Sequence, residues 1–255
     1  MRLRGRKNIR ESLERQPDLV VLEPQKRKGR WREFFGNDRP IHVEIGMGKG
    51  QFISRMSVSH PEVNFIGLDM YDELLRRGSE KARALWREKG LDRVPNLALV
   101  RGNAEYLDLM FAEGEVERIY LNFSDPWPKA KHAKRRLTHP RFLLKYRKVL
   151  NDRGEIHFKT DSPLLFEFSL NSFADTGLQM RNISLNLHRE RLREDLVLTE
   201  YESKFVGQGL PIYRLEAVVG SAALEEHRRR TAEALAAALR RGGAKEPAPA
   251  EPAED

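Results

Sequence analysis

The sequence of 255 residues contains no cysteine, and this absence excludes several kinds of site. Without thiols the chain cannot form a disulfide scaffold, bind a metal through thiolates or use a cysteine nucleophile. It also lacks an uninterrupted apolar run of the ~18 residues that a membrane-spanning helix requires. No apolar core follows the basic N-terminus, so we expect a cytoplasmic protein without a secretory signal or a membrane partner. The seven histidines show no ligand spacing, so we predict no metal.

Positive charge, in contrast, is abundant. The 46 Lys and Arg residues outnumber the 38 Asp and Glu residues and give a net charge of +8. Such a balance favours a polyanionic partner, although it also serves solubility alone. One basic run lies at Lys129–Arg136, and residues 1–38 form a basic arm that we predict to be mostly irregular, with one short helical or strand piece near Leu19–Leu22. The arm is either a disordered solubilising tail or an RNA contact, and the basic run of the same sign favours RNA.

Apolar and amphipathic segments alternate along residues 39–220, which predicts one α/β domain with a doubly wound, mostly parallel sheet. Seven segments have the pattern of strands: Ile41–Ile45, Val63–Asp69, Leu97–Val100, Arg118–Phe123, Glu155–Thr160, Leu178–Leu187 and Ile212–Val219. The segments predicted as helices are Gln51–Met56, Asp72–Lys89, Tyr106–Phe111, Pro140–Leu150, Leu164–Phe173 and Thr199–Phe205. Residues 221–241 are predicted to form a charged helix, and residues 242–255 a disordered acidic tail.

Glycines at alternate positions follow the first predicted strand, at Gly46, Gly48 and Gly50. They let the backbone approach a ligand where a Cβ atom would block it. Asp69 ends the next strand about twenty residues later, a spacing at which an acid reaches ribose hydroxyls. The loop departs from the dinucleotide fingerprint, because Gln51 stands where that pattern has a third glycine. A tight strand–helix turn without a ligand explains these glycines equally well.

A rigid loop follows the predicted strand Arg118–Phe123. Two prolines flank Trp127 and hold it, with Asp125, at the carboxyl end of the strand, which is where open α/β sheets bind ligands. A carboxylate, an indole and the basic run Lys129–Arg136 together suit a nucleobase and its phosphates. Trp127 either stacks on a base or packs the loop.

Four segments together resemble the bacterial tRNA (guanine-N7)-methyltransferases: VEIGMGKG (43–50), GLD (67–69), GNA (102–104) and NFSDPWPK (122–129). Thr160-Asp161 and Thr199–Glu202 also fit, and the resemblance covers the whole predicted domain, although Ser124 stands where many members have proline. It implies a Rossmann-like class I methyltransferase fold with S-adenosyl-L-methionine as methyl donor. It further implies that the acceptor is guanine 46 in the variable loop of tRNA. We expect a monomer or a homodimer.

The resemblance also implies roles for individual residues. Asp125 is the implied catalytic residue between donor and base. The implied cofactor-binding residues are Glu44, Gly46, Gly48, Asp69, Asn103, Ala104 and Asp125. The implied guanine-binding residues are Lys129, Asp161, Thr199, Glu200, Tyr201 and Glu202. The implied tRNA contacts are Lys131, His132, Ala133, Lys134, Arg135 and Arg136.

Structural and functional alternatives remain beside this interpretation. Thr199 and Glu202 have the spacing of a capping box, and Glu44, Asp69 and Asp161 also suit helix caps or dipole partners. One alternative function is an amino-methyltransferase on another RNA or on DNA, because Asn122–Trp127 loosely resembles an Asn-Pro-Pro-Tyr loop. Another is a catalytically silent RNA-binding protein on the same fold.

Overall fold

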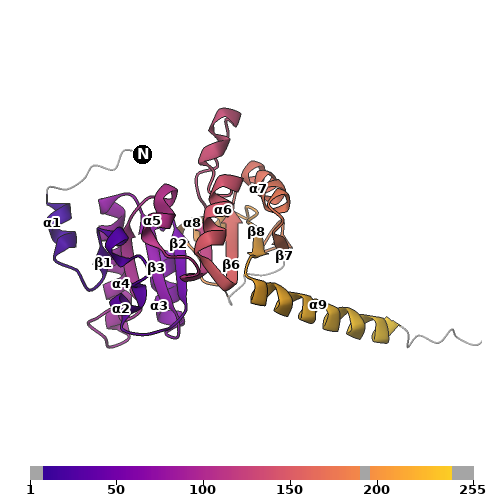
Figure 1. Cartoon of the computed structure of the whole chain (residues 1–255). Coiled ribbons are helices and arrows are strands. Elements are labelled where there is room, and N and C mark those ends of the chain that lie inside the picture. Colours follow the sequence, from indigo (N-terminus) through magenta and orange to yellow (C-terminus); the bar gives the residue numbers. More distant parts are fainter. Residues whose placement is uncertain (1–7, 190–195, 243–255) are drawn as a thin grey trace, which may run out of the picture.

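An eight-stranded sheet organises the part of the chain that the computed structural model describes, residues 8–189 and 196–242 (Figure 1). The strand order is β1-β4-β3-β2-β5-β6-β8-β7, and β8 alone runs antiparallel to its neighbours. The strands are β1 Val20–Val21, β2 Ile41–Ile45, β3 Asn64–Asp69, β4 Leu97–Arg101, β5 Val116–Asn122, β6 Leu150–Thr160, β7 Gln179–Ser184 and β8 Tyr213–Val218. The predicted mostly parallel, doubly wound α/β fold is confirmed.

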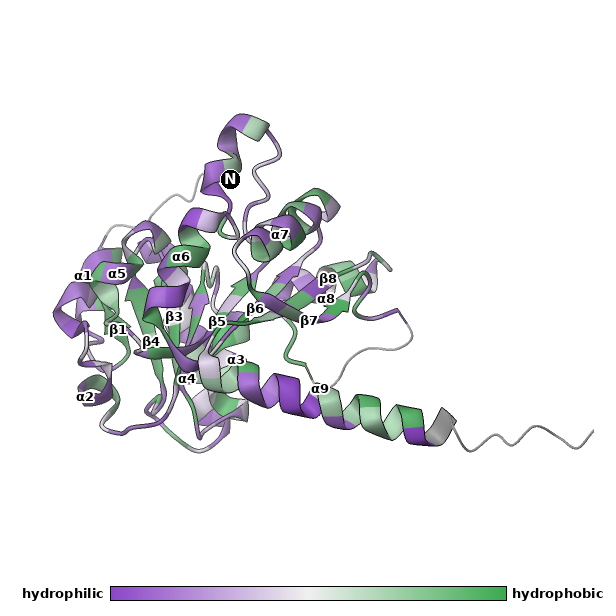
Figure 2. Cartoon of the chain, turned by 45° about the vertical axis from the view of Figure 1, so that its right-hand side comes forward, coloured by the Kyte–Doolittle hydropathy of each residue, from purple (hydrophilic) through white to green (hydrophobic). Residues whose placement is uncertain are grey.

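Helices cover both faces of this sheet. They are α1 Ile9–Glu14, η1 Pro24–Arg27, α2 Trp31–Phe35, α3 Gln51–Ser59, α4 Asp72–Glu88, η2 Ala104–Tyr106, α5 Leu107–Met110, η3 Ala130–Arg135, α6 Pro140–Val149, α7 Pro163–Asp175, α8 Glu200–Gly207 and α9 Ser221–Gly242. Successive strand residues point to opposite faces. In β4, Ala98 and Val100 pack in a core with α5, α6 and α7, whereas Leu97 and Leu99 pack in a core with α1, α3 and α4. Figure 2 shows the apolar strands between helices whose outer sides are hydrophilic.

The N-terminal segment differs from the predicted irregular arm. From Asn8 onward it contains α1, β1, η1 and α2. β1 lies within the short helical or strand piece predicted near Leu19–Leu22, and it joins the sheet as an eighth strand beside the seven predicted ones. The cause is apolar burial among the basic residues, because Leu13, Leu19 and Trp31 are fully buried. The indole of Trp31 also donates to the Met110 carbonyl oxygen at 3.0 Å. The segment therefore belongs to the packed body, while residues 1–7 lie outside the described part.

The last helix, α9, projects away from the sheet in both views (Figures 1 and 2). Its bounds, Ser221–Gly242, agree with the charged helix expected at residues 221–241. The tail predicted to be disordered lies outside the described residues from position 243 onward. Among the described helices, none combines the length and apolarity needed to cross a membrane.

Candidate active site

A cavity of about 670 Å³ opens at the carboxyl ends of β2, β3, β4 and β5. This size lies within the usual range for small-molecule sites, and this edge is where open parallel sheets bind ligands. Its lining includes five residues that the resemblance assigns to the cofactor: Gly46, Asp69, Asn103, Ala104 and Asp125. Four loops distant in the sequence thus meet at one site.

The glycine loop between β2 and α3 is in a conformation that side chains rarely adopt. Gly46, Gly48 and Gly50 have φ angles of 78°, 55° and 73°. A Cβ atom added to Gly46 meets no protein atom within 4 Å, so it would project into the open cavity. One added to Gly50 would lie 2.9 Å from the Cα atom of Gly78 in α4. The loop therefore needs glycine both for its backbone and for close approach.

Asp69, the last residue of β3, connects the loop after β3 with the glycine loop after β2. Its Oδ2 accepts from the Gly48 amide at 3.1 Å and its Oδ1 from the Tyr71 amide at 3.2 Å. Burial raises the pKa of this carboxyl, against the backbone amides, which lower it. The remaining lone pairs of the two oxygens can accept from ligand hydroxyls at the cavity wall.

The third loop presents Asn103 to the cavity. Its side-chain oxygen accepts from the Glu105 amide at 2.9 Å and so caps η2, which leaves its amide group available to a ligand. Glu105 also pairs with Arg141 of α6, whose Nη1 donates to its carboxylate at 3.2 Å. Both charged residues line the cavity, and their pairing ties α6 to its rim.

The fourth loop, which carries Asp125, is strained and braced. Phe123 and Trp127 have positive φ angles of 51° and 42°, which is uncommon for aromatic residues. Such strain persists where the surroundings hold the chain, and it is concentrated at functional sites. Arg136 provides the brace, since its Nε donates to the Pro126 carbonyl at 3.1 Å. Asp125 is exposed at the cavity between the two strained residues.

The basic run after this loop divides into two environments. Lys129, Lys131, Lys134 and Arg135 are exposed, and η3 carries most of this surface. The Cζ atom of Arg135 lies 4.9 Å from the Trp127 ring centroid, and the ring of His132 meets the indole edge-on at 5.7 Å. Arg136, which the resemblance placed among the tRNA contacts, is buried instead and bonds the loop.

Glu44 lies behind the cavity rather than in its lining. Its side chain is 2% exposed, and its Oε1 accepts from the Asn122 amide group at 2.9 Å. Burial raises the pKa of Glu44 to about 8, against the lowering effects of Asn122 and the charge of Lys159. A pKa of about 8 favours the protonated acid at neutral pH, and the backbone amide of Ile53 also acts to lower this pKa. Among the described residues, none makes a hydrogen bond of good geometry to Glu44 Oε2.

The Thr199–Glu202 segment forms the predicted capping box at the start of α8. Glu202 is fully buried, and its Oε2 accepts from Lys159 Nζ at 2.6 Å. His188 Nε2 lies 3.0 Å from its other oxygen. Thr199 is buried with it, and neither residue belongs to the lining of the cavity.

Glu200 and Tyr201, which lie between Thr199 and Glu202, contact other parts of the protein. Glu200 pairs with Lys81 of α4 at 2.6 Å and with Lys49 of the glycine loop at 3.1 Å. Tyr201 is exposed, and its ring stacks on that of Phe123 with centroids 6.2 Å apart. The segment thus brings one aromatic side chain to the Asp125 loop.

Asp161 directly follows β6, whose neighbour β5 leads to Asp125. The amide of Phe123 donates to the Lys159 carbonyl at 2.9 Å, so the two chains leave the sheet side by side. Asp161 is partly exposed, and Ser162 rather than Asp161 caps α7. Asp161 is therefore free of the capping role considered for it.

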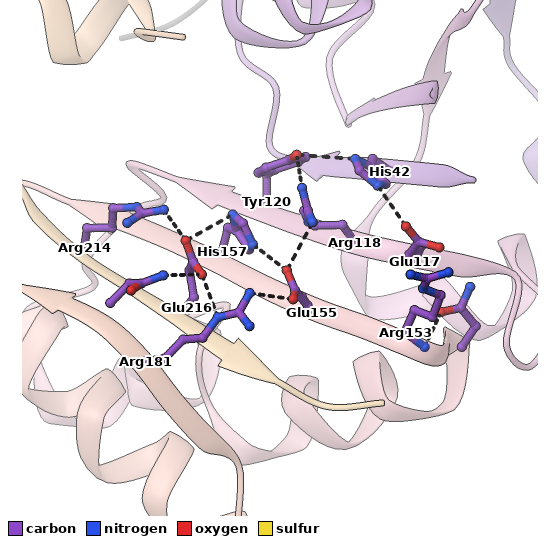
Figure 3. A network of polar contacts seen from close by, with 12 residues as sticks. His42, Glu117, Arg118, Tyr120, Arg153, Glu155, His157, Arg181, Arg214 and Glu216 are labelled. Atoms are coloured by element: carbon purple, nitrogen blue, oxygen red, sulfur yellow. Dashed lines mark hydrogen bonds and ion pairs between the residues drawn. The ribbon is translucent and has the colours of Figure 1, made fainter. Parts of the chain in front are cut away.

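A polar network that includes Glu155 and His157 of β6 lies on one face of the sheet (Figure 3). Lys159, two residues after His157 in the same strand, is on that face too. His157 Nε2 lies 2.9 Å from Glu155 Oε2, and Arg181 donates to the other Glu155 oxygen at 2.6 Å. Burial alone raises the pKa of Glu155, but His157, Arg118 and Arg181 together lower it to about 2. Burial lowers the pKa of His42 to about 4.

Several of these features were missed by sequence reasoning, namely the Arg141–Glu105 pair, the Asn122–Glu44 bond and the Lys159–Glu202 pair. One signal for the last was present. In β6 the polar residues Glu155, His157 and Lys159 alternate with apolar ones, which indicates a polar sheet face.

Comparisons with known proteins agree with this geometry. The family model described as "Putative methyltransferase" matches residues 38–215. A tRNA (guanine-N(7)-)-methyltransferase of Streptococcus sanguinis (strain SK36) is 49% identical over 217 residues, which cover 85% of this chain and 99% of the relative. One of Geobacillus sp. (strain WCH70) is 50% identical over 216 residues, which cover 85% and 94%.

Solved structures give the same architecture. A 16S rRNA (adenine(1408)-N(1))-methyltransferase from Catenulisporales acidiphilia, with its cosubstrate SAM, matches with a TM-score of 0.55 at 19% identity. The match covers 78% of this chain and 92% of that chain. At this identity the likeness shows the fold alone, which is that of a methyltransferase.

Proposed function

This chain belongs to the tRNA (guanine-N7)-methyltransferase family, and on that premise we propose that it methylates N7 of guanine 46 in the variable loop of tRNA. The methyl donor is S-adenosyl-L-methionine. The observation that carries the proposal is the position of Asp125, which lies in the lining of one cavity with Gly46, Asp69 and Asn103. This arrangement joins a cofactor-sized cleft to the loop that continues into the basic run.

When bound, S-adenosyl-L-methionine supplies a methyl group on a positively charged sulfur. Transfer breaks the S–C bond and forms a C–N7 bond in line with it, so the positive charge passes from sulfur to the guanine ring. The lone pair of N7 attacks directly, and no proton has to leave the base first. The task of the protein is therefore alignment and electrostatic support rather than general base catalysis.

Asp125 is suited to that task. Its carboxylate can accept from an N–H group of the base and stabilise the charge that develops on the ring. We assign Asp161 and Lys129 to the edge of the same guanine and Tyr201 to its face, since Tyr201 is exposed and stacks on Phe123. Thr199, Glu200 and Glu202 support this pocket through the contacts of α8.

The cofactor residues fit their assigned roles to different degrees. Gly46 and Gly48 keep the loop open, and Asp69 can accept from ribose hydroxyls. Asn103 and Ala104 line the cavity where we place the adenine edge. Glu44 is buried and accepts from Asn122, so it joins the end of β2, just before the glycine loop, to the end of β5.

The exposed basic residues are the proposed tRNA contacts. Lys131, Lys134 and Arg135 are exposed, and His132 and Ala133 are partly so. The charges of Lys131, Lys134 and Arg135 would neutralise phosphates, which makes binding strongly salt-dependent. We propose that the enzyme acts in the cytoplasm, as a monomer or a homodimer.

One structural finding separates this proposal from an amino-methyltransferase. The Asn122 side chain is 8% exposed and donates to Glu44, so it is not presented to a base. The test is incubation of the protein with labelled donor and unmodified tRNA, followed by identification of the nucleoside. We expect 7-methylguanosine, whereas N6-methyladenosine or no incorporation would reject the proposal. A tRNA with adenine at position 46 is the matched control and should take up no label there.

A further inference from the structure

We propose that Lys159 is a positioning residue for methyl transfer, because its buried ion pair with Glu202 docks α8 beside the loop that carries Asp125. The catalytic part of this inference rests on the proposed function. The structural part rests on the contacts of α8 alone, so the two can fail separately.

The pair itself is deeply buried. Lys159 Nζ donates to Glu202 Oε2 at 2.6 Å, and the two residues are 7% and 0% exposed. The ammonium also lies 5.6 Å from the ring centroid of Phe52 in α3. Removing one partner from such a pair leaves the other charge unpaired away from water, which is strongly unfavourable. Loss of Lys159 is therefore expected to expel Glu202, and with it the first turn of α8.

That first turn connects the two loops on which the reaction depends. Glu200 pairs with Lys49 of the glycine loop at 3.1 Å. Tyr201 stacks on Phe123, two residues before Asp125, with an angle of 25° between the rings. Phe205, one turn later, is parallel to Phe123 within 8°. If α8 is displaced, the strained backbone of Phe123 loses its packing partners on this side.

Both carboxylate oxygens of Glu202 are engaged by groups of the protein. Its Oε2 accepts from Lys159 and from the Thr199 amide, the latter at 3.3 Å, while His188 Nε2 lies 3.0 Å from Oε1. The side chain is 0% exposed. We infer that Glu202 supports the guanine pocket through Lys159 and α8 rather than by touching the base.

A double-mutant cycle tests this inference. Lys159→Met keeps the aliphatic stem without the charge, and Glu202→Gln keeps the shape of the acid. We expect each single variant to lower kcat/KM for tRNA about 100-fold. The cofactor Kd should change by less than about threefold, because neither α8 nor its glycine-loop partner Lys49 lines the cavity. The kcat/KM of the double variant should be at least about tenfold higher than that of the less active single variant, since the double variant buries no unpaired charge. Lys89→Met, at the exposed end of α4, is the control and should match the wild type.

A direct contact between Glu202 and the base gives a different pattern. Then the kcat/KM of Lys159→Met would be close to that of the wild type, and the kcat/KM of the double variant would be no higher than that of Glu202→Gln. This result overturns the proposal.

Hydrogen–deuterium exchange supplies a readout without activity. Residues 200–207 should exchange faster in Lys159→Met, while β3 and β4 stay protected. Unchanged exchange in α8 also overturns it. If the single variants are too unstable to purify, the exchange of residues 200–207 is compared between the double variant, which also lacks the ion pair, and the wild type. Faster exchange in the double variant supports the proposal, and unchanged exchange overturns it. A wild type that fails to methylate guanine instead rejects the proposed function and leaves the exchange test intact.

Discussion

Arg136 holds the backbone of Trp127, since its Nη2 donates to the Trp127 carbonyl oxygen at 3.0 Å. Its guanidinium also lies 4.3 Å from the ring centroid of Phe168 in α7. The adjacent Arg135 is exposed above the indole of Trp127. Two consecutive arginines therefore have different tasks: one fixes the strained loop beside Asp125, and the other faces solvent where tRNA is proposed to bind.

The two arginines should respond differently to substitution. Arg136→Met removes two bonds from a buried cation to loop carbonyls, so we expect a loss of about 2–3 kcal/mol of stability together with reduced kcat. Arg135→Ala should leave stability unchanged and lower the slope of log K for tRNA against log salt by about 1. Chemical denaturation and tRNA binding at several salt concentrations measure both. Equal effects of the two variants on the salt slope would contradict this division.

Asp125→Ala should abolish methyl transfer while the cofactor Kd stays within about tenfold, or ~1.4 kcal/mol. The reason is that Asp125 is one of several cavity residues for the cofactor but the carboxylate proposed to support the charged base. Because the side chain is exposed, the thermal midpoint should not change. Isothermal titration with the cofactor and single-turnover methylation separate the two effects, and Asp125→Asn tests the charge alone. Large loss of cofactor binding would move Asp125 into the cofactor site proper.

The sequence predicted the parts of the fold that depend on local pattern. The bounds of β2 and the ligand edge of the sheet followed from short apolar strands that lead into glycine or proline loops. Apart from the short piece near Leu19–Leu22, the structured N-terminal segment was missed because its buried residues, Leu13 and Trp31, are sparse among basic ones. Burial of Arg136 was also out of reach, since its partners are backbone carbonyls, which no sequence pattern reveals.

The polar network should make the protein labile in acid. The folded-state pKa of His42 is lowered to about 4 by burial, so between pH 6.5 and 4 only the unfolded state binds this proton. The stability from His42, about 3 kcal/mol, is therefore present at neutral pH and lost as the pH falls through that window. Glu155, whose pKa is lowered to about 2, also loses its contribution to stability as the pH falls below 4.5.

Urea denaturation from pH 7 to pH 4 measures this loss. A His42→Phe variant has no imidazole to protonate, so its unfolding free energy should fall less over the same range. His60→Phe, which changes a half-exposed histidine, is the matched control and should follow the wild type. Parallel profiles for all three proteins would show that His42 does not titrate as its burial requires.

Glu44 should have the opposite effect on the pH dependence of stability. Its folded-state pKa is raised from 4.5 to about 8, so between these values the folded protein holds a proton that the unfolded chain releases. Its contribution is complete below pH 4.5 and is lost as the pH rises to 8, by about 4 kcal/mol. Glu44→Gln imitates the protonated acid, and its advantage over the wild type should grow from pH 5 to pH 8. The control is Glu113→Gln, which changes an exposed acid. A stability difference that stays constant with pH would mean that Glu44 is ionised in the fold, with a partner at its second oxygen.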